Sequence, residues 1–201
     1  MNKLISQYIG FGLLILLGLS ASCQTAKEKQ TLPVIGKVTR SFQFVDQDSQ
    51  VVNNETVKGK YYVTDFFFTS CPTICPKMKA QMLTVYEEFK DQDQLLLLSH
   101  SIDTRNDSVP VLKEYSERLG VDRQRWRFVT GDKKEIFEMA KHYMVTAMED
   151  ANSPGGYAHS GAFILVDPEG QVRGVYDGTQ EIETQDLIQD IKQLLHGQEA
   201  Q

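Results

Sequence analysis

Apolar residues cluster along this chain in patterns that distinguish strands from helices. Tyr61–Phe68 and Leu95–Ile102 are apolar on both faces, which predicts buried central strands. Trp126–Val129 predicts a third core strand. Nearer the start, Phe42–Val45 alternates, and a turn-like polar run separates it from Val51–Val52, which predicts a β-hairpin. The pattern therefore predicts a sheet whose middle strands are covered on both sides.

Apolar residues spaced three and four apart predict four helices. Their inner faces hold Met78, Met82, Val85 and Phe89; Val109, Leu112, Tyr115 and Leu119; Ile136, Met139, Ala140 and Tyr143; and Leu187, Ile188, Ile191 and Leu195. Ser108, Asp132 and Thr184 are expected to cap the last three of these helices. Gly120 is expected to end the second one.

The segment before the last helix predicts a loop and a second hairpin. Residues 145–158 lack periodicity and predict an irregular, mobile loop. His159 then leads into a strand at Phe163–Val166, and a turn returns the chain into Val172–Tyr176. Strands that alternate with helices and end in a hairpin predict an α/β fold, with a central mixed sheet flanked by helices and an N-terminal β-hairpin.

The first residues have the layout of an export signal. Lys3 precedes the apolar run Tyr8–Leu19, which is short for a transmembrane helix. The small residues 20–22 before Cys23 resemble a bacterial lipobox, in which the chain is cut before the cysteine and its sulfur is lipidated. We expect a lipoprotein-type signal peptide at residues 1–22 and lipidation of Cys23. A chance cysteine near an ordinary cleavage site and an uncleaved signal anchor are the alternatives.

The rest of the chain is predicted to be a tether and one domain. Residues 23–32 are polar and lack periodicity, which predicts a flexible tether, and residues 33–197 predict the folded domain. Acyl chains on Cys23 would hold an exported protein on a membrane, facing the periplasm or the cell exterior. The chain has 21 Lys and Arg against 27 Asp and Glu, a net charge of −6, and no basic cluster. Nucleic acid is therefore excluded as a partner.

Two cysteines remain for the domain, and they lie in one short motif. Cys71 and Cys75 follow the first buried strand and precede the first long helix. Backbone N–H groups and the macrodipole at a helix N-terminus favour thiolate over thiol. A disulfide between residues at this spacing requires Cys71 to lie ahead of the helix, because residues four apart within a helix have Cβ atoms about 5–6 Å apart. The pair is predicted to bind a metal, to perform disulfide chemistry, or both, and a dicysteine turn after a buried strand favours a thioredoxin-like fold.

Soft sulfur ligands favour copper, and an added imidazole makes a three-coordinate site. Structural zinc needs four closed ligands, for which the domain lacks cysteines. Of the four histidines, His159 is preferred because it lies where the loop meets a strand. His100 ends a buried strand and is expected to be a core histidine, whereas His142 and His196 are expected to face solvent.

Three segments resemble the Sco/SenC family of copper-binding, thioredoxin-like proteins. They are Asp65–Pro76 with Met78, residues 101–108 with 111–115, and residues 159–160 followed by 163–170. Thr104 and Val109 depart from the family, which often has proline at both positions. The resemblance implies that Cys71, Cys75 and His159 bind one copper ion, as Cu(I) or Cu(II). It also implies a role in assembling the copper centre of cytochrome c oxidase, by delivering copper or by reducing the target cysteines. The copper-centre subunit of that oxidase is then the expected partner, together with other periplasmic copper or thiol-redox proteins.

Asp65, Asp103 and Asp107 lie in the segments that carry this resemblance. Asp65 lies six residues before Cys71 and is a candidate for a hydrogen bond near the site or for holding Cu(II), with a solvated strand end as the alternative. Asp103 and Asp107 are expected to be loop and capping residues. A metallochaperone is favoured over an enzyme. A thiol:disulfide reductase that uses Cys71 and Cys75 as its redox pair, and a copper or redox sensor, are the alternatives.

Overall fold

The computed structural model describes residues 32–198. The predicted signal peptide at residues 1–22, Cys23 and nearly all of the predicted tether lie outside this range, so these expectations stay predictions. Among residues 32–198, none of the helices combines the length and the apolar character needed to cross a bilayer.

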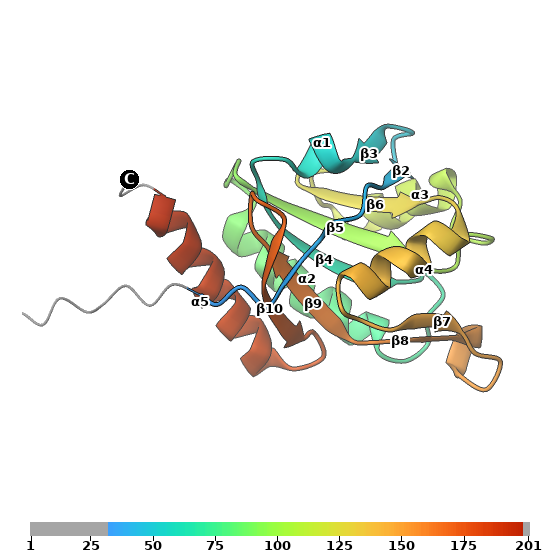
Figure 1. Cartoon of the computed structure of the whole chain (residues 1–201). Helices are drawn as coiled ribbons and strands as arrows, with labels where there is room; N and C mark the ends of the chain where they lie inside the picture. Colours follow the sequence, from blue (N-terminus) through green and yellow to red (C-terminus); the bar gives the residue numbers. More distant parts are fainter. Residues whose placement is uncertain (1–31, 199–201) are drawn as a thin grey trace, which may run out of the picture. The chain divides into compact units, whose positions relative to one another are not determined.

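The centre of the fold is one mixed sheet with strand order β1-β10-β9-β4-β5-β6-β2-β3 (Figure 1). Its strands are β1 (Gly36–Lys37), β2 (Gln43–Asp46), β3 (Val51–Asn53), β4 (Tyr61–Phe67), β5 (Leu95–Ser101), β6 (Trp126–Thr130), β9 (Ala162–Val166) and β10 (Gln171–Asp177). The neighbours β4, β5 and β6 run parallel. The remaining pairs in this sheet are antiparallel, including the predicted N-terminal hairpin of β2 and β3. The predicted mixed α/β sheet is confirmed.

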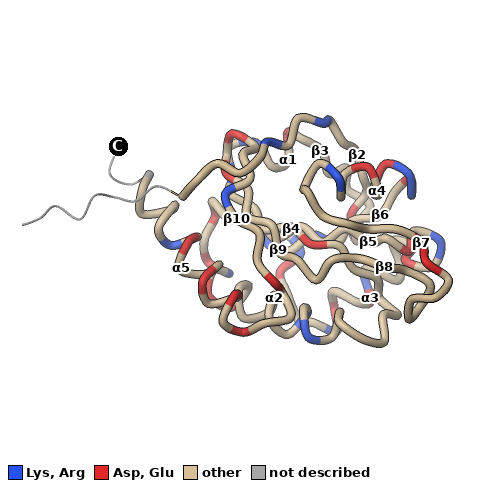
Figure 2. The backbone as a smooth tube through the Cα atoms, turned by 60° about the horizontal axis from the view of Figure 1, so that its bottom comes forward, with Lys and Arg blue, Asp and Glu red and all other residues tan. Residues whose placement is uncertain are grey.

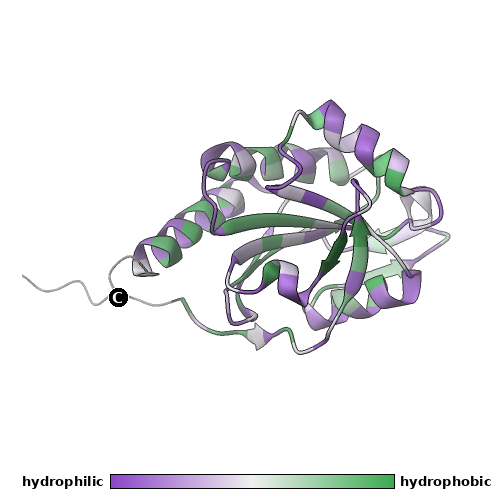
Figure 3. Cartoon of the chain, turned by 90° about the horizontal axis from the view of Figure 1, so that it is seen from above, coloured by the Kyte–Doolittle hydropathy of each residue, from purple (hydrophilic) through white to green (hydrophobic). Residues whose placement is uncertain are grey.

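Helices cover both faces of the sheet. They are α1 (Asn54–Val57), α2 (Cys75–Phe89), α3 (Val109–Leu119), α4 (Lys133–His142) and α5 (Glu181–Gln198). Every residue of β4 and β5 is buried, as expected for strands with an apolar pattern on both faces. Figure 3 shows hydrophobic residues along the strands in the middle of the sheet. Adjacent β4 residues show the two faces: Phe67 stacks on Tyr115 of α3, whereas Phe66 contacts Tyr143 at the end of α4.

Helix ends agree with the sequence in part. The Asp132 side chain accepts a hydrogen bond from the Glu135 N–H at 3.0 Å and caps α4. Gly120 ends α3 with φ of 67°, a left-handed conformation that glycine adopts without strain. Ser108 is at the N-cap position of α3, but its side chain makes no capping hydrogen bond. The expected cap at Thr184 is wrong: α5 begins at Glu181, and the Thr184 hydroxyl donates to the Gln180 carbonyl within the first turn.

The prediction of an irregular loop at residues 145–158 is also wrong. Strand β7 (Ala147–Glu149) pairs antiparallel with β8 (Tyr157–His159), and a short 3₁₀ turn, η1 (Pro154–Gly156), lies between them. We call residues 147–159 the arm. Its strands are short, and each pairs only with the other among the described residues. Gly155 and Gly156 have φ of 78° and 84°, which lets the chain reverse direction in a stretch without apolar periodicity.

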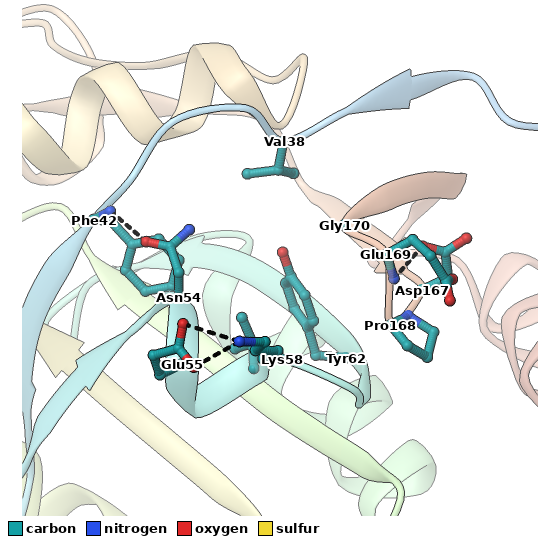
Figure 4. Close-up of a pocket in the computed structure, with 11 residues that line it drawn as sticks. Val38, Phe42, Asn54, Glu55, Lys58, Tyr62, Asp167, Pro168, Glu169 and Gly170 are labelled. Atoms are coloured by element: carbon teal, nitrogen blue, oxygen red, sulfur yellow. Dashed lines mark hydrogen bonds and ion pairs between the residues drawn. The ribbon is translucent and has the colours of Figure 1, made fainter.

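The distribution of charge and the pocket at the start of β4 offer no further candidate site. Charges of both signs are interspersed along the described chain, in agreement with the absence of a basic cluster (Figure 2). A pocket of about 180 Å³, lined in part by Tyr62, Asp167 and Gly170, lies where β4 begins and β9 ends (Figure 4). The motif follows the other end of β4. No cysteine or histidine lines this pocket, so it offers no soft metal ligand.

Candidate metal centre

The two thiols are placed by the turn that joins β4 to α2. The Cys71 N–H donates to the Phe68 carbonyl at 3.3 Å, and α2 begins at Cys75. Cys71 therefore lies in the turn ahead of the helix, the position that the spacing requires for contact between the sulfurs. Ile74 is at the N-cap of α2 and provides no side-chain cap. Backbone N–H groups at this helix start are thus left to interact with sulfur.

A buried carboxylate in the loop after the neighbouring strand β5 fixes the same turn. Asp107 accepts hydrogen bonds from the Thr69 N–H at 3.0 Å and from the Thr69 and Ser101 hydroxyls, each at 2.5 Å. Ser101 ends β5, so Asp107 ties the thiol turn to the end of the adjacent parallel strand. This agrees with the expected loop role of Asp107. It also gives the thiol turn two hydrogen bonds to a buried carboxylate that a third hydrogen bond ties to β5.

The arm brings His159 to the thiols. The Sγ atoms of Cys71 and Cys75 and a ring nitrogen of His159 lie within 4.8 Å of one another. Cys75 Sγ and His159 Nε2 are 3.5 Å apart, and both cysteines are free thiols. His159 Nδ1 is 3.1 Å from the Ser160 carbonyl, which only accepts hydrogen bonds, so Nδ1 carries the proton. The Nε2 lone pair therefore faces the thiols, as a metal ligand requires.

The two thiols have different acidities. Burial raises the pKa of Cys71, but hydrogen bonds from the Cys75 side chain and from the backbone at Thr73 and Cys75 outweigh it, so its pKa lies below the ordinary value. Burial and the hydrogen bond to Cys71 hold the pKa of Cys75 well above its usual range. Cys71 is thus the sulfur that ionises first, and Cys75 keeps its proton.

The imidazole is held in its neutral form. Burial lowers the pKa of His159, although the Ser160 carbonyl and Asp65 oppose this shift. Two soft sulfur donors and one neutral imidazole nitrogen fit Cu(I) in three-coordinate geometry. Among the described residues, no further Cys, His, Asp or Glu belongs to this group, so the closed four-ligand set of structural zinc is not formed.

Asp65 is a buried residue of the central sheet. Its side chain is 2% exposed, so the alternative of a solvated strand end is wrong. Burial raises the pKa of Asp65, while Lys79, the Ser99 hydroxyl and His159 act to lower it. One carboxylate oxygen has no hydrogen-bond partner. Asp65 thus interacts electrostatically with Lys79 and with the candidate ligand His159. Its role in supporting the copper ligands stays a prediction.

The other candidate residues lie elsewhere. His100 is fully buried, and its Nδ1 lies 3.0 Å from the Thr64 hydroxyl, as expected for a core histidine. His142 on α4 and His196 on α5 do not belong to the thiol group. Asp103 accepts a hydrogen bond from the Tyr157 hydroxyl at 2.9 Å and so joins the arm to the loop after β5.

Lys79 is the residue near the site that sequence reasoning missed. It lies one helical turn after Cys75 and is only 8% exposed. The helix pattern contained a signal for this placement. Position 79 is four residues from Cys75 and three from Met82, so it falls on the inner stripe of α2, where a lysine is unusual.

The fold and the site define a thioredoxin-like protein with two thiols at the start of a helix and an imidazole beside them. A family model described as SCO1/SenC matches residues 32–196. The chain therefore belongs to the SCO1/SenC family, as the resemblance in its sequence indicated.

Solved structures agree with this assignment. A SCO1/SenC family lipoprotein from Bacillus anthracis superposes with a TM-score of 0.73 at 29% identity, covering 80% of this chain and 96% of that protein. BsSco, described with a disulfide switch and as a member of the Sco family of cytochrome c oxidase assembly proteins, gives 0.71 at 31% identity, covering 82% and 97%. Yeast Sco1 with copper bound gives 0.61 at 25% identity, covering 80% and 90%. The predicted copper cofactor agrees with that bound metal and with the donor set found here.

Proposed function

We propose that this chain is a membrane-anchored copper-binding protein that helps assemble the copper centre of cytochrome c oxidase by delivering copper. One observation carries the proposal: two free thiols and a neutral imidazole converge within 4.8 Å at the start of α2. The family membership, the copper in the yeast relative and the assembly role stated for BsSco support it. The copper-centre subunit of the oxidase is the proposed recipient.

The geometry supports release as well as binding. Two ligands come from the α2 start, and the third comes from the arm, which reaches the loop after β5 through Tyr157 and Asp103. A recipient with thiolate and imidazole ligands takes the ion by ligand exchange, replacing one donor at a time. Because a three-coordinate site leaves room for an incoming ligand, a closed four-ligand cage would not serve this role as well.

The binding step is tested by titrating the reduced full-length protein with Cu(I) against a competing chelator. We expect one Cu(I) per chain, and a large loss of affinity for Cys75→Ser. Cys23→Ser is the matched control, because this cysteine precedes the predicted domain, and it should bind copper as the wild type does. Unchanged copper affinity in Cys75→Ser would overturn the proposed site.

The anchor is a separate part of the proposal and needs its own experiment. The apolar run before Cys23 and the lipoprotein description of the Bacillus anthracis relative support it. Cells expressing the wild type and Cys23→Ala are labelled with a radioactive fatty acid and fractionated. We expect label in the wild type and none in the variant, with the variant released from the membrane. An unlabelled wild type would contradict lipidation at Cys23.

A thiol:disulfide reductase is the second candidate, and the unequal acidities of the two free thiols favour it. The Cys71 thiolate would attack a target disulfide, forming a mixed disulfide and releasing one target thiolate. Cys75, after losing its proton, would then attack the Cys71 sulfur and release the second target sulfur. The target gains two electrons, and this chain ends as the Cys71–Cys75 disulfide.

One genetic experiment separates the two candidates. The gene is deleted, and cytochrome c oxidase activity is measured after adding either copper or a membrane-permeant thiol reductant. Copper delivery predicts rescue by copper alone. Rescue by the reductant alone would replace delivery with the reductase as the function of this site.

A further inference from the structure

Lys79 holds a positive charge inside the protein, on the sheet face that underlies the thiols. Its Nζ lies 4.6 to 4.8 Å from the centres of four aromatic rings. The rings belong to Phe67, Tyr115, Trp126 and Phe128. Among the described residues, Nζ has no hydrogen-bond partner. The ammonium is therefore stabilised by ring faces and by nearby opposite charge.

A buried ammonium without a hydrogen bond is costly, and an apolar residue would fill this cage without that cost. Burial lowers the pKa of Lys79 to about 8, while Asp65 and Cys75 act to raise it. The lysine thus remains mostly protonated at pH 7. Two groups favour its charged form: the Asp65 carboxylate on β4 and Cys75 of the candidate metal centre, which acts in this way once it is ionised, as it is when it binds a metal.

The charge matters because the two oxidation states of a bound copper ion give the site different net charges. Two thiolates, one neutral imidazole and Cu(I) carry −1, whereas the same ligands with Cu(II) carry zero. A nearby fixed cation stabilises the first state more than the second. Low exposure keeps this interaction from being screened as a surface charge would be.

We propose that Lys79 is a positioning residue that acts through charge, making the Cys71–Cys75–His159 site select Cu(I) over Cu(II). This inference rests on the proposed copper-binding function. It assigns no ligand role to Lys79, whose ammonium has no lone pair to offer.

The test compares Lys79→Met with Lys77→Met. Methionine has a similar length and packs well against aromatic rings, so the first variant should fold, as thermal unfolding will show. Lys77 is an exposed lysine on the same helix and serves as the matched control. The Cu(II)/Cu(I) reduction potential of each copper-loaded protein is measured by mediated titration, in which the mediator supplies the single electron.

We expect Lys79→Met to lose about tenfold in Cu(I) affinity relative to Cu(II), which lowers the one-electron potential by about 59 mV. The control should match the wild type. Proton uptake by Asp65 would mask the loss of charge, so the same comparison is repeated in the Asp65→Asn background. A fall in either background supports the inference, and an unchanged potential in both overturns it.

The result also separates this inference from the proposed function. If the wild-type protein binds no copper, the proposed function fails before Lys79 is tested. If the wild type binds one copper ion and the potential does not change on removal of Lys79, only the inference fails. Lys79→Leu provides a second uncharged variant should Lys79→Met unfold, and it should show the same fall in potential.

Discussion

The two faces of the central strands each bury a titratable side chain among aromatic rings, and the two differ in what surrounds them. On the α4 face, His100 stacks on Phe66 with ring centres 4.9 Å apart and meets Phe44 and Tyr143. On the face that carries α2 and α3, Lys79 is enclosed by four rings. Burial lowers both pKa values, that of His100 to about 3 and that of Lys79 to about 8.

The difference shows that burial and a shifted pKa do not by themselves mark a functional site. His100 donates to the Thr64 hydroxyl, which in turn donates to the Leu98 carbonyl at 2.8 Å, and its cluster contains no thiol. Lys79 shares its face with Asp65 and interacts with Cys75. Function is indicated by convergence of side chains with complementary chemistry, which the second face has and the first lacks.

The largest expected effect comes from removing a ligand on the thiol side. Cys75→Ser should reduce Cu(I) affinity more than about hundredfold, because loss of a direct ligand should cost more than loss of a group that only supports one. A competition titration with a Cu(I) chelator measures this. His100→Phe is the contrasting variant and should bind copper as the wild type does. Equal losses in both variants would mean that the two faces are not functionally distinct.

A smaller effect is expected at the carboxylate that supports the thiol turn. Asp107→Ala leaves the Thr69 N–H and two hydroxyls without their shared acceptor, so the free energy of unfolding should fall by about 2 kcal/mol. Urea unfolding at pH 7 measures it. Asp91→Ala, at an exposed aspartate, should change stability by less than about 0.5 kcal/mol. If Asp107→Ala is no less stable than this control, Asp107 does not anchor the turn.

An effect of similar size concerns the histidine in the core and depends on pH. The pKa of His100 is about 3 in the folded protein, against 6.5 as its ordinary value, because burial disfavours the charged ring. Below pH 6.5 the unfolded chain takes up a proton that the folded protein does not, so stability falls as pH decreases. This group contributes up to about 1.4 kcal/mol per pH unit between pH 6.5 and 3.

His100→Phe should remove this contribution, so its stability should decrease less steeply than that of the wild type between pH 7 and pH 4.5. Urea unfolding at both pH values gives the difference. His142→Phe, at a half-buried position at the end of α4, is the matched substitution outside the core and should keep the wild-type slope. A variant at position 100 with the wild-type slope would show that His100 is not held neutral in the core.

The central strands of the sheet could be predicted from the sequence because they are buried on both faces. Tyr61–Phe68 predicted β4 to within one residue, and Leu95–Ile102 did the same for β5, since a strand buried on both faces needs an unbroken apolar run. The thiol turn could be predicted for a chemical reason, because a single close pair of cysteines at a helix start contributes little to the stability of a domain. His159 was favoured through its position and the family resemblance.

The strands of the arm and the surroundings of Lys79 could not be predicted from the sequence, for different physical reasons. Strands β7 and β8 pair with each other through a glycine-containing turn, and they do not need an apolar face. The position of Lys79 was visible as part of the helical stripe, but its aromatic cage was not. That cage combines Phe67, Tyr115, Trp126 and Phe128, which come from β4, α3 and β6 and meet only after folding.

The claim that Cys71, Cys75 and His159 form a single copper site is tested most directly by X-ray absorption at the copper edge. The reduced full-length protein is loaded with one equivalent of Cu(I) and compared with His159→Ala. We predict two sulfur ligands and one nitrogen ligand in the wild type, and loss of the nitrogen in the variant with both sulfurs retained. Identical spectra for the two proteins, or fewer than two sulfur ligands in the wild type, would contradict the account.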